Sequence, residues 1–396
     1  MQKNQRKFLR NNLKIFYLTQ GLTSLIFLTG TWAAYELKFL TFTQLALIEA
    51  TFMTIQLLTE LPTGAFADLV GKKITVQIGY FLKAFSMVIF AFSQSFEWFL
   101  VYAIFLGIGD AMNSGAAEAL LYDTLKQAGV ENNFSRYWSK LSLVFQIGLS
   151  LASLVGGWLD VIWLRLPALG YAAALFLAGI ATSGFIEPKV DTEKFTLYNY
   201  YRQAKQGIKE ISKTTYSTYL SLFYILVGGI SLAVMNSFKT IILTDLGYTN
   251  TQIGTFLGIA RISYSVLLFQ ILRVDRLVTK KRAFYLFPIL LIFSMAPMYW
   301  LDKWVALPFI AISMLVSTAR WTILAEYTNQ VFTSKNRATA ISTVSMIIGL
   351  FYVVVMLGAG PVMEKFGGSP IIFTILGIIS AVTILPLGMY LAKNNS

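Results

Sequence analysis

The sequence has no histidine and no cysteine among its 396 residues. Without histidine, a Ser-His-Asp triad and an HExxH zinc site are excluded, and any proton carrier must be a carboxylate or another group. Without cysteine, disulfides, thiolate metal sites and thiol chemistry are excluded. These absences weaken an enzymatic function, and we expect a protein that is not an enzyme, with no catalytic residue, no metal and no cofactor.

Charge is also scarce, since 13% of the residues are charged and 56% are hydrophobic. A soluble domain carries about 25% charged residues. Apolar stretches of about 20 residues recur along the chain, enough to cross the roughly 30 Å hydrocarbon layer as helices. The formal charge of +13 does not indicate nucleic-acid binding, because the basic residues lie between apolar spans. The sequence predicts an all-α membrane protein whose partner is the lipid bilayer, not nucleic acid.

Apolar runs between polar breaks predict twelve transmembrane helices. The basic N-terminus resembles a signal peptide, but the apolar run that follows reaches about Leu37, so we expect a retained first helix. The predicted spans are approximately 13 to 35, 41 to 67, 74 to 94, 97 to 124, 138 to 159, 164 to 186, 217 to 243, 249 to 272, 284 to 301, 304 to 331, 339 to 362 and 369 to 392.

The distribution of lysine and arginine predicts the orientation. With the N-terminus inside, most of the 32 basic residues fall in inward loops and tails, as the positive-inside rule requires. Both termini are then cytoplasmic. The exceptions are four outward residues, Lys38, Arg165, Lys303 and Lys365, and four residues within spans, Lys83, Lys239, Arg261 and Arg320.

The longest polar segment, residues 187–214, divides the spans six and six. We therefore expect an N-terminal six-helix bundle at residues 1–186 and a C-terminal six-helix bundle at residues 215–396, joined by a cytoplasmic linker. Within the linker, apolar residues recur at helical spacing and lysines occupy another face. This pattern is typical of an amphipathic helix on the inner membrane surface. A helical lead-in to the seventh span is the alternative.

A short loop after the second span, "GAFADLVGKK", gathers Gly64, Asp68, Gly71, Lys72 and Lys73. The chain must reverse there within a few residues, and the glycines permit close packing and unusual backbone angles. The aspartate can accept hydrogen bonds from a neighbouring helix N-terminus, and the lysines hold the loop in the cytoplasm. It is not a phosphate-binding loop, because six residues separate the glycines and Lys73 stands where Ser or Thr is required.

These five residues and the twelve spans resemble the major facilitator superfamily and its loop motif G-x-x-x-D-x-x-G-[RK]-[RK]. The resemblance implies two six-helix bundles, a monomer, and a loop that latches the halves in the outward-open state. Three further stretches, "ELPTG", "SGAAEALLYD" and "NRATAIS", resemble a bacterial drug-exporter branch of that superfamily. The implied location is the plasma membrane of a bacterium, crossed many times.

The chain departs from the family pattern at several positions. Leu69 stands where a basic residue often follows the motif aspartate. In the fifth span, "GLSLASLVGG" is similar to the antiporter motif G-x-x-x-G-P-x-x-G-G, but Ala152 and Ser153 replace its central Gly-Pro pair. The arginine that the family often carries in the fourth span would fall near Ala103. These departures weaken the assignment to the antiporters.

Ionisable groups within spans are the first site candidates, because each costs about 2.5 to 3.5 kcal/mol to insert. At 1.5 Å per residue, Asp110 lies about 20 Å and Arg261 about 18 Å from the outer ends of their spans, near the midplane. Asp110, Asn113 and Glu118 share one side of the fourth span. We expect a proton or substrate pathway there, with Asp110 as the first candidate for the proton carrier and Glu118 as the second. A permanent ion pair that fastens helices is the alternative.

In the second half, the expected pathway residues are Asn236, Lys239, Arg261 and Arg320. The resemblance favours the residues of the seventh and tenth spans. Lys239 either lines the path or extends to the interface. Several other embedded charges have open assignments: Lys83 either extends to the interface or pairs with an acid in its own half, and Glu49 and Glu60 are ambiguous, with a structural role favoured for Glu60.

These patterns predict a secondary transporter that exports small amphipathic or cationic compounds by proton antiport with alternating access. Its partners are then a small-molecule substrate and protons, and sodium is the alternative coupling ion. A proton-coupled importer of a sugar, peptide or organic anion is the closest rival, and a lipid flippase is the third. From other classes, a membrane-embedded enzyme is weakened by the missing histidine and cysteine, and a receptor by the missing extramembrane domain.

Overall fold

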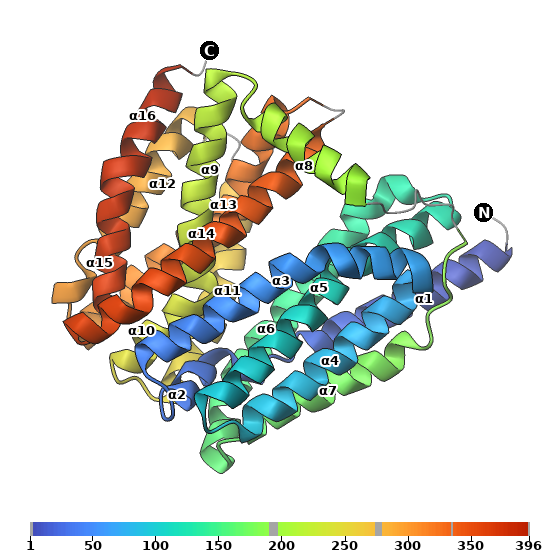
Figure 1. The fold of residues 1–396 in the computed structure, drawn as a ribbon, viewed down its shortest axis with the longest axis horizontal. Coiled ribbons are helices and arrows are strands. Elements are labelled where there is room, and N and C mark those ends of the chain that lie inside the picture. Colours follow the sequence, from blue (N-terminus) through green and yellow to red (C-terminus); the bar gives the residue numbers. More distant parts are fainter. Residues whose placement is uncertain (1–2, 190–196, 274–278, 334–335, 395–396) are drawn as a thin grey trace. The chain divides into compact units, whose positions relative to one another are not determined.

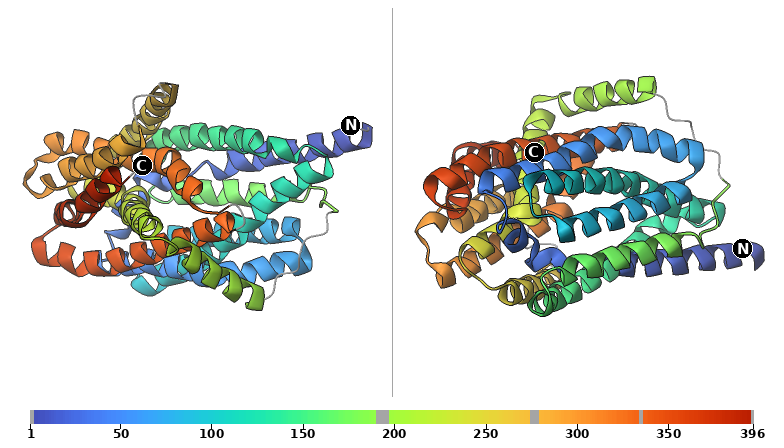
Figure 2. Two further views of the ribbon diagram at one scale, coloured as in Figure 1. Left: turned by 90° about the horizontal axis from the view of Figure 1, so that it is seen from above. Right: turned by 60° about the horizontal axis from the view of Figure 1, so that its bottom comes forward.

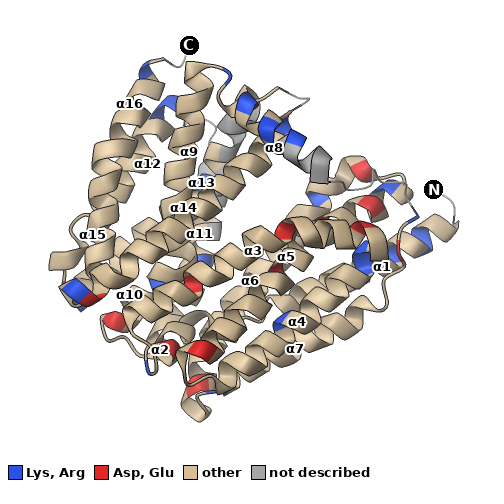
Figure 3. Cartoon of the chain, viewed as in Figure 1, with Lys and Arg blue, Asp and Glu red and all other residues tan. Residues whose placement is uncertain are grey.

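The computed structural model describes residues 3–189, 197–273, 279–333 and 336–394, and these residues contain helices and turns but no strand. Nine helical segments in this part of the chain are long and apolar enough to cross a membrane. Charged residues are sparse along most of these helices (Figure 3). The prediction of an all-α membrane protein is confirmed, whereas the twelve spans and the cytoplasmic termini stay predictions.

Residue contacts divide the chain into two compact units. Unit 1 comprises Met1–Leu40, Thr51–Thr196 and Thr249–Ile262, and unit 2 comprises Thr41–Ala50, Leu197–Tyr248 and Ser263–Ser396. Two helices therefore contribute to both units, α3 (Phe42–Val70) and α11 (Asn250–Arg273). The predicted division at residues 187–214 into two six-helix bundles stays a prediction.

Unit 1 is built from the first helices of the chain (Figure 1). Its predicted first span is interrupted after Thr23, because the chain forms a short 3-10 turn before it becomes α-helical again. Besides its parts of α3 and α11, the unit contains α1 (Lys3–Thr23), η1 (Phe27–Gly30), α2 (Trp32–Glu36), α4 (Lys72–Phe92), α5 (Phe96–Gln127), η2 (Glu131–Asn133), α6 (Phe134–Ile162) and α7 (Leu166–Thr182).

Unit 2 contains the remaining helices, two of which are broken by a π-helical turn. Such turns insert one extra residue into an α-helix and are frequent at functional sites. Besides its parts of α3 and α11, the unit contains α8 (Leu197–Ile211), α9 (Thr215–Ala233), η3 (Val234–Phe238), α10 (Lys239–Asp245), α12 (Lys280–Met295), η4 (Met298–Trp300), α13 (Lys303–Val331), α14 (Arg337–Phe366), α15 (Pro370–Ile379), η5 (Ser380–Ile384) and α16 (Leu385–Lys393).

Helices α4, α5 and α7 run side by side in unit 1 (Figure 2). The approach of α4 to α5 depends on glycine. A Cβ at Gly79 would lie 3.0 Å from the carbonyl oxygen of Gly109, and a Cβ at Gly109 would lie equally close to that of Gly79. Small residues at such contacts allow helix backbones to pack closely in membranes. This packing places the polar side chains of α4 and α5 within reach of one another.

Candidate functional site

The central feature of unit 1 is an ion pair between Lys83 of α4 and Asp110 of α5. Both side chains are largely withdrawn from solvent, with 14% and 26% of their surfaces exposed. Gly109 makes room for the lysine, because a Cβ there would lie 2.6 Å from the lysine Cγ. Of the two predicted alternatives for Lys83, the structure shows the pairing with an acid in its own half.

The neighbouring candidates on α5 have different surroundings. Asn113 is partly buried, and its amide group donates a 3.0 Å hydrogen bond to the carbonyl oxygen of Val76 on α4. Glu118, five residues further along, is exposed. The structure thus places Asp110 and Asn113 against α4 and Glu118 on a solvent-accessible face of the same helix.

Arg261 lies in unit 1, in the part of α11 that packs against α6. Its guanidinium donates a 2.9 Å hydrogen bond to the side-chain oxygen of Gln146. Nearer the start of α11, the Asn250 amide donates to the Asp160 carboxylate at 2.7 Å. Both contacts join α11 to α6, so this arginine helps to attach the first half of α11.

Arg320 on α13 is fully buried in unit 2. Its guanidinium carbon lies 5.3 Å from the centre of the Tyr224 ring on α9, within the range of a cation–π interaction. A Cβ at Gly228 would lie 2.8 Å from one guanidinium nitrogen, so glycine leaves the space that the arginine fills. This packing makes Arg320 part of the contact between α9 and α13.

A second polar cluster in unit 2 surrounds Glu49, in the first turns of α3. The Ser237 hydroxyl donates to one carboxylate oxygen at 2.5 Å, and the Tyr352 hydroxyl of α14 donates to the same oxygen at 2.9 Å. The two hydroxyls lie 2.6 Å apart. Lys239, which is 5% exposed, interacts electrostatically with the carboxylate. We call these four residues the Glu49 cluster.

The π-helical turn η3 separates the two pathway candidates of the seventh predicted span. Asn236 lies within the turn and is exposed, whereas Ser237 beside it is fully buried. Lys239 begins the next helix and is also buried. The structure therefore directs Lys239 to the Glu49 cluster and Asn236 to an exposed position.

The predicted loop motif forms a one-residue connection between α3 and α4. Gly71 is the only residue between the two helices, and its φ of 100° is a value that side chains disfavour. The Glu187 carboxylate accepts hydrogen bonds from the backbone N–H groups of Lys72 and Lys73, at 2.8 and 2.9 Å. A carboxylate at a helix N-terminus is favoured because the N–H groups there lack partners within the helix.

The side chains of the loop complete this connection. Lys72 forms an ion pair with Asp123, near the end of α5. Asp68 is exposed, and no atom lies within 4 Å of a Cβ built at Gly64. The latch function of this loop stays a prediction.

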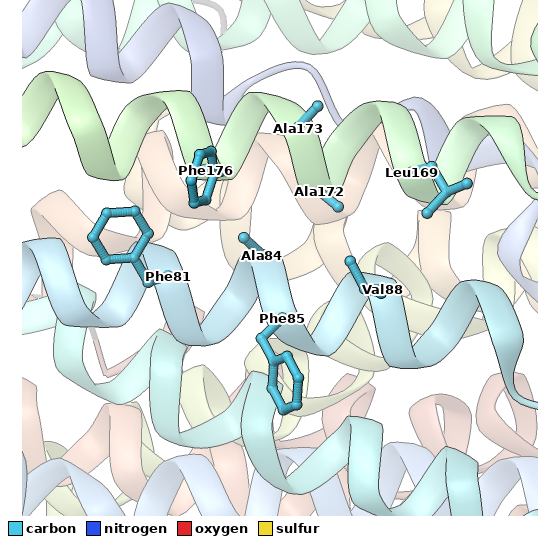
Figure 4. Close-up of a pocket in the computed structure, with 8 residues that line it drawn as sticks. All are labelled: Phe81, Ala84, Phe85, Val88, Leu169, Ala172, Ala173 and Phe176. Atoms are coloured by element: carbon cyan, nitrogen blue, oxygen red, sulfur yellow. The ribbon is translucent and has the colours of Figure 1, made fainter.

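An apolar groove of about 560 Å³ lies between α4 and α7 (Figure 4). Its walls include three phenylalanines, two of which, Phe85 and Phe176, are about half exposed. The lining residues are Phe81, Ala84, Phe85, Val88, Leu169, Ala172, Ala173 and Phe176. This lining suits hydrocarbon and offers no ionic contact for a polar solute, so the embedded charges are better candidates for the transport site.

The sequence profile of the Major Facilitator Superfamily matches residues 15–326. The chain belongs to this superfamily. This membership follows from a match that covers most of the predicted spans. The chain is therefore a membrane transporter and not an enzyme.

Two superfamily relatives show sequence similarity to the chain. An uncharacterized MFS-type transporter, YxaM of Bacillus subtilis (strain 168), is 24% identical over 276 residues, which cover 68% of each chain. The quinolone resistance protein NorA of Staphylococcus aureus (strain MRSA252) is 25% identical over 192 residues, which cover 48% of each chain. The similarity to NorA thus spans about half of that protein.

Solved superfamily structures share the fold. The nucleoside transporter NupG matches with a TM-score of 0.77 over 98% of this chain and 99% of its own, at 14% identity. A bacterial homolog of the human lysosomal transporter Spinster matches with a TM-score of 0.74 over 99% and 98%, also at 14% identity. Such low identity supports the fold alone and leaves the substrate open.

Several residues of these sites could not be identified from sequence. Ser237 and Tyr352 are ordinary residues of apolar spans, and Gln146 and Glu187 follow no motif that marks them as partners. Glu49 gave the clearest signal, since it is an acid inside an apolar span. The sequence did not indicate which residues would surround it.

Proposed function

We propose that this superfamily member exports small amphipathic or cationic compounds in exchange for protons, by alternating access. The observation that carries the proposal is the Lys83–Asp110 ion pair within two membrane-spanning helices. The partial relative NorA, named for quinolone resistance, supports a drug-like substrate.

The ion pair suggests how exchange can be coupled. A carboxylate in a low-dielectric site attracts one positive partner strongly, so Lys83, a bound proton and a cationic substrate compete for Asp110. When a proton neutralises the carboxylate, a cationic substrate loses its attraction and leaves. When the proton departs, the negative charge is restored for the next substrate molecule. Mutual exclusion at one carboxylate, together with alternating access, then couples substrate exit to proton entry.

The rival reading, import of an anionic solute, relies on the embedded cations. Each of these cations has a contact in its own unit: Lys239 with Glu49, Arg261 with Gln146, and Arg320 with the ring of Tyr224. An anionic substrate that used all three cations would have to displace three contacts, whereas a cationic substrate at Asp110 would have to displace one partner, Lys83. The arrangement therefore favours export of cationic compounds.

Uptake into inverted membrane vesicles tests the proposal. A panel of cationic dyes, quinolones and metabolites is offered with and without an imposed inward-acid pH gradient. We expect gradient-dependent accumulation of at least one cationic compound, and loss of the gradient dependence in the Asp110→Asn variant, because an amide cannot carry the proton. Glu97→Gln, a substitution of an exposed acid in the first turn of α5, is the matched control and retains accumulation.

The Lys83→Gln variant separates a proton carrier from a structural ion pair. If the pair only fastens α4 to α5, Lys83→Gln and Asp110→Asn lose accumulation equally. If Asp110 carries the proton, Lys83→Gln retains part of the gradient-driven accumulation, with an altered pH profile. Undiminished accumulation in Asp110→Asn contradicts the proposal.

A further inference from the structure

The start of α3 is attached to α14 along one face of each helix, and the Glu49 cluster lies at the end of this contact. The carboxylate of Glu364 accepts a 2.9 Å hydrogen bond from the Thr43 N–H. One turn along α14, a Cβ at Gly360 would lie 2.7 Å from the Thr43 Cα and 3.0 Å from the Ala46 Cβ. Two turns further, Tyr352 binds Glu49. The successive spacings follow the helical repeat of two antiparallel helices.

Glu49 marks the point where α3 leaves unit 2. The segment of α3 that belongs to this unit is Thr41–Ala50, and the rest of the helix belongs to unit 1. Glu49 is the last charged residue of that segment, about 10 Å along the helix from its start at 1.5 Å per residue. In the predicted orientation, this start faces the outside of the cell. An external proton thus has a short route to the carboxylate.

We propose that the Glu49 cluster is a second proton-binding site, in which protonation of Glu49 detaches the start of α3 from α14 and α10. This inference rests on the proposed proton coupling and assigns to it the step that opens the outer side. The inference can be tested separately from the Asp110 site, because the Glu49 cluster lies in unit 2 and Asp110 lies in unit 1.

The physical reason is the difference between a carboxylate and a carboxylic acid in this cluster. As a carboxylate, Glu49 accepts two hydrogen bonds from hydroxyl groups and attracts the buried ammonium of Lys239. Hydrogen bonds to a charged acceptor are roughly twice as strong as those between neutral groups. A proton on Glu49 removes this advantage and the attraction to Lys239 together. The titratable groups that face Glu49 are Lys239 of α10 and Tyr352 of α14.

The local backbone supports a switch at this position. Ser237 reaches Glu49 from η3, where the π-helical turn interrupts the α-helical hydrogen bonding of α9 and α10. π-helical turns are rare and are frequent at functional sites. The hydroxyl that contacts Glu49 therefore comes from an irregular part of the helix.

Electron paramagnetic resonance distances between two spin labels test the inference without any substrate. The chain has no cysteine, so Leu47→Cys on α3 and Val354→Cys on α14 label specifically. Both side chains are exposed, at 37% and 67%, and both lie in unit 2. We expect the distance distribution to move to longer values when the purified, lipid-reconstituted transporter is acidified from about pH 8 to about pH 5.

Three variants in this labelled background decide the outcome. Glu49→Gln, which mimics the protonated acid, gives the longer distances at both pH values. Tyr352→Phe keeps the response but moves its midpoint to higher pH, since it removes one donor to the carboxylate; a merely structural role would not move the midpoint. Asp110→Asn keeps the pH-dependent change in distance, so a failure of the proposed transport site can be distinguished from a failure of the Glu49 inference. A distribution that ignores pH in the parent, or a Glu49→Gln variant that matches the parent at both pH values, overturns the inference.

Discussion

Two embedded acids, Asp110 and Glu49, have chemically matched partners in their own units. Lys83 meets Asp110, and Glu49 meets two hydroxyl groups and Lys239. An ionisable residue in a span costs about 2.5 to 3.5 kcal/mol to insert, and such contacts offset part of that cost. The same contacts make the charge state of each residue matter, since removing one charge from a buried pair is destabilising. This property is what a proton-driven transporter needs.

Outside the spans, Glu210 provides the pH-dependent contact that can be tested most simply. Hydrogen bonds from the Asn336 side chain and the Thr333 N–H hold the pKa of Glu210 below its usual value of 4.5. The two bonds measure 3.0 and 2.9 Å. Because the pKa is lowered in the folded protein, the stabilisation is present above pH 4.5 and is lost as the pH falls through the lowered value.

We therefore expect Glu210→Gln at pH 7 to reproduce the effect of acidification. A hydrogen bond to a charged group contributes about 1.5 kcal/mol, so exchange of the Thr333 amide for deuterium becomes about tenfold faster. The amide of Gln252, which donates to the Thr249 hydroxyl in unit 1, is an internal control because no carboxylate accepts its hydrogen bond. Equal exchange at Thr333 in variant and parent would show that Glu210 does not hold this contact.

At the scale of elements, two helices are attached by glycine contacts near their starts. In unit 1, a Cβ at Gly157 of α6 would lie 2.5 Å from the Thr251 Cα of α11. In unit 2, Gly360 of α14 has the corresponding contact with Thr43 of α3. Backbone atoms cannot move aside as a flexible side chain can. Glycine at these positions therefore sets how closely α11 and α3 approach their neighbours.

Gly360→Ala tests this attachment against a matched control on the same helix. No atom lies within 4 Å of a Cβ built at Gly358, so Gly358→Ala changes helix propensity by the same amount without a clash. We expect Gly360→Ala to be less stable than Gly358→Ala by about 1 to 3 kcal/mol, the usual cost of overpacking. Thermal unfolding in detergent measures the difference. Equal midpoints for the two variants would mean that the contact is loose.

The helices themselves were largely predictable from the sequence, whereas their contacts were not. Apolar runs bounded by polar residues located the helices. The turn at Gly71 between α3 and α4 was expected because only a few residues separate the second and third predicted spans. The interruption after Thr23 and the π-helical turn at Val234–Phe238 were missed, because apolar composition does not distinguish a continuous helix from one that shifts its hydrogen bonding. The linker helix α8 lies within the predicted segment.

The polar sites depended on contacts that no local pattern records. Glu49 and Tyr352 are 303 residues apart in the chain, and their meeting depends on the register of α3 against α14. The ion pair of Lys83 with Asp110 depends in the same way on the glycine contact of α4 with α5. Sequence reasoning could identify embedded charges as candidates, since each is costly, but pairing them required the packed helices.

At the scale of the whole molecule, superfamily membership and the two compact units support a transporter in which helices α3 and α11 link the units. The proposed Asp110 site lies in unit 1 and the proposed Glu49 site in unit 2. Movement of either shared helix therefore involves residues of both units. This arrangement predicts that substrate exchange and proton movement are obligatorily coupled.

Proton movement driven by a substrate gradient tests this coupling most directly. Proteoliposomes that contain the purified transporter and a trapped pH indicator are loaded with a transported cationic compound and diluted into compound-free buffer, without an imposed pH gradient. We expect the interior to become more acidic as the compound leaves, and Asp110→Asn to abolish this signal. Exit of the compound with no change in internal pH, or with an alkaline change, would contradict proton antiport.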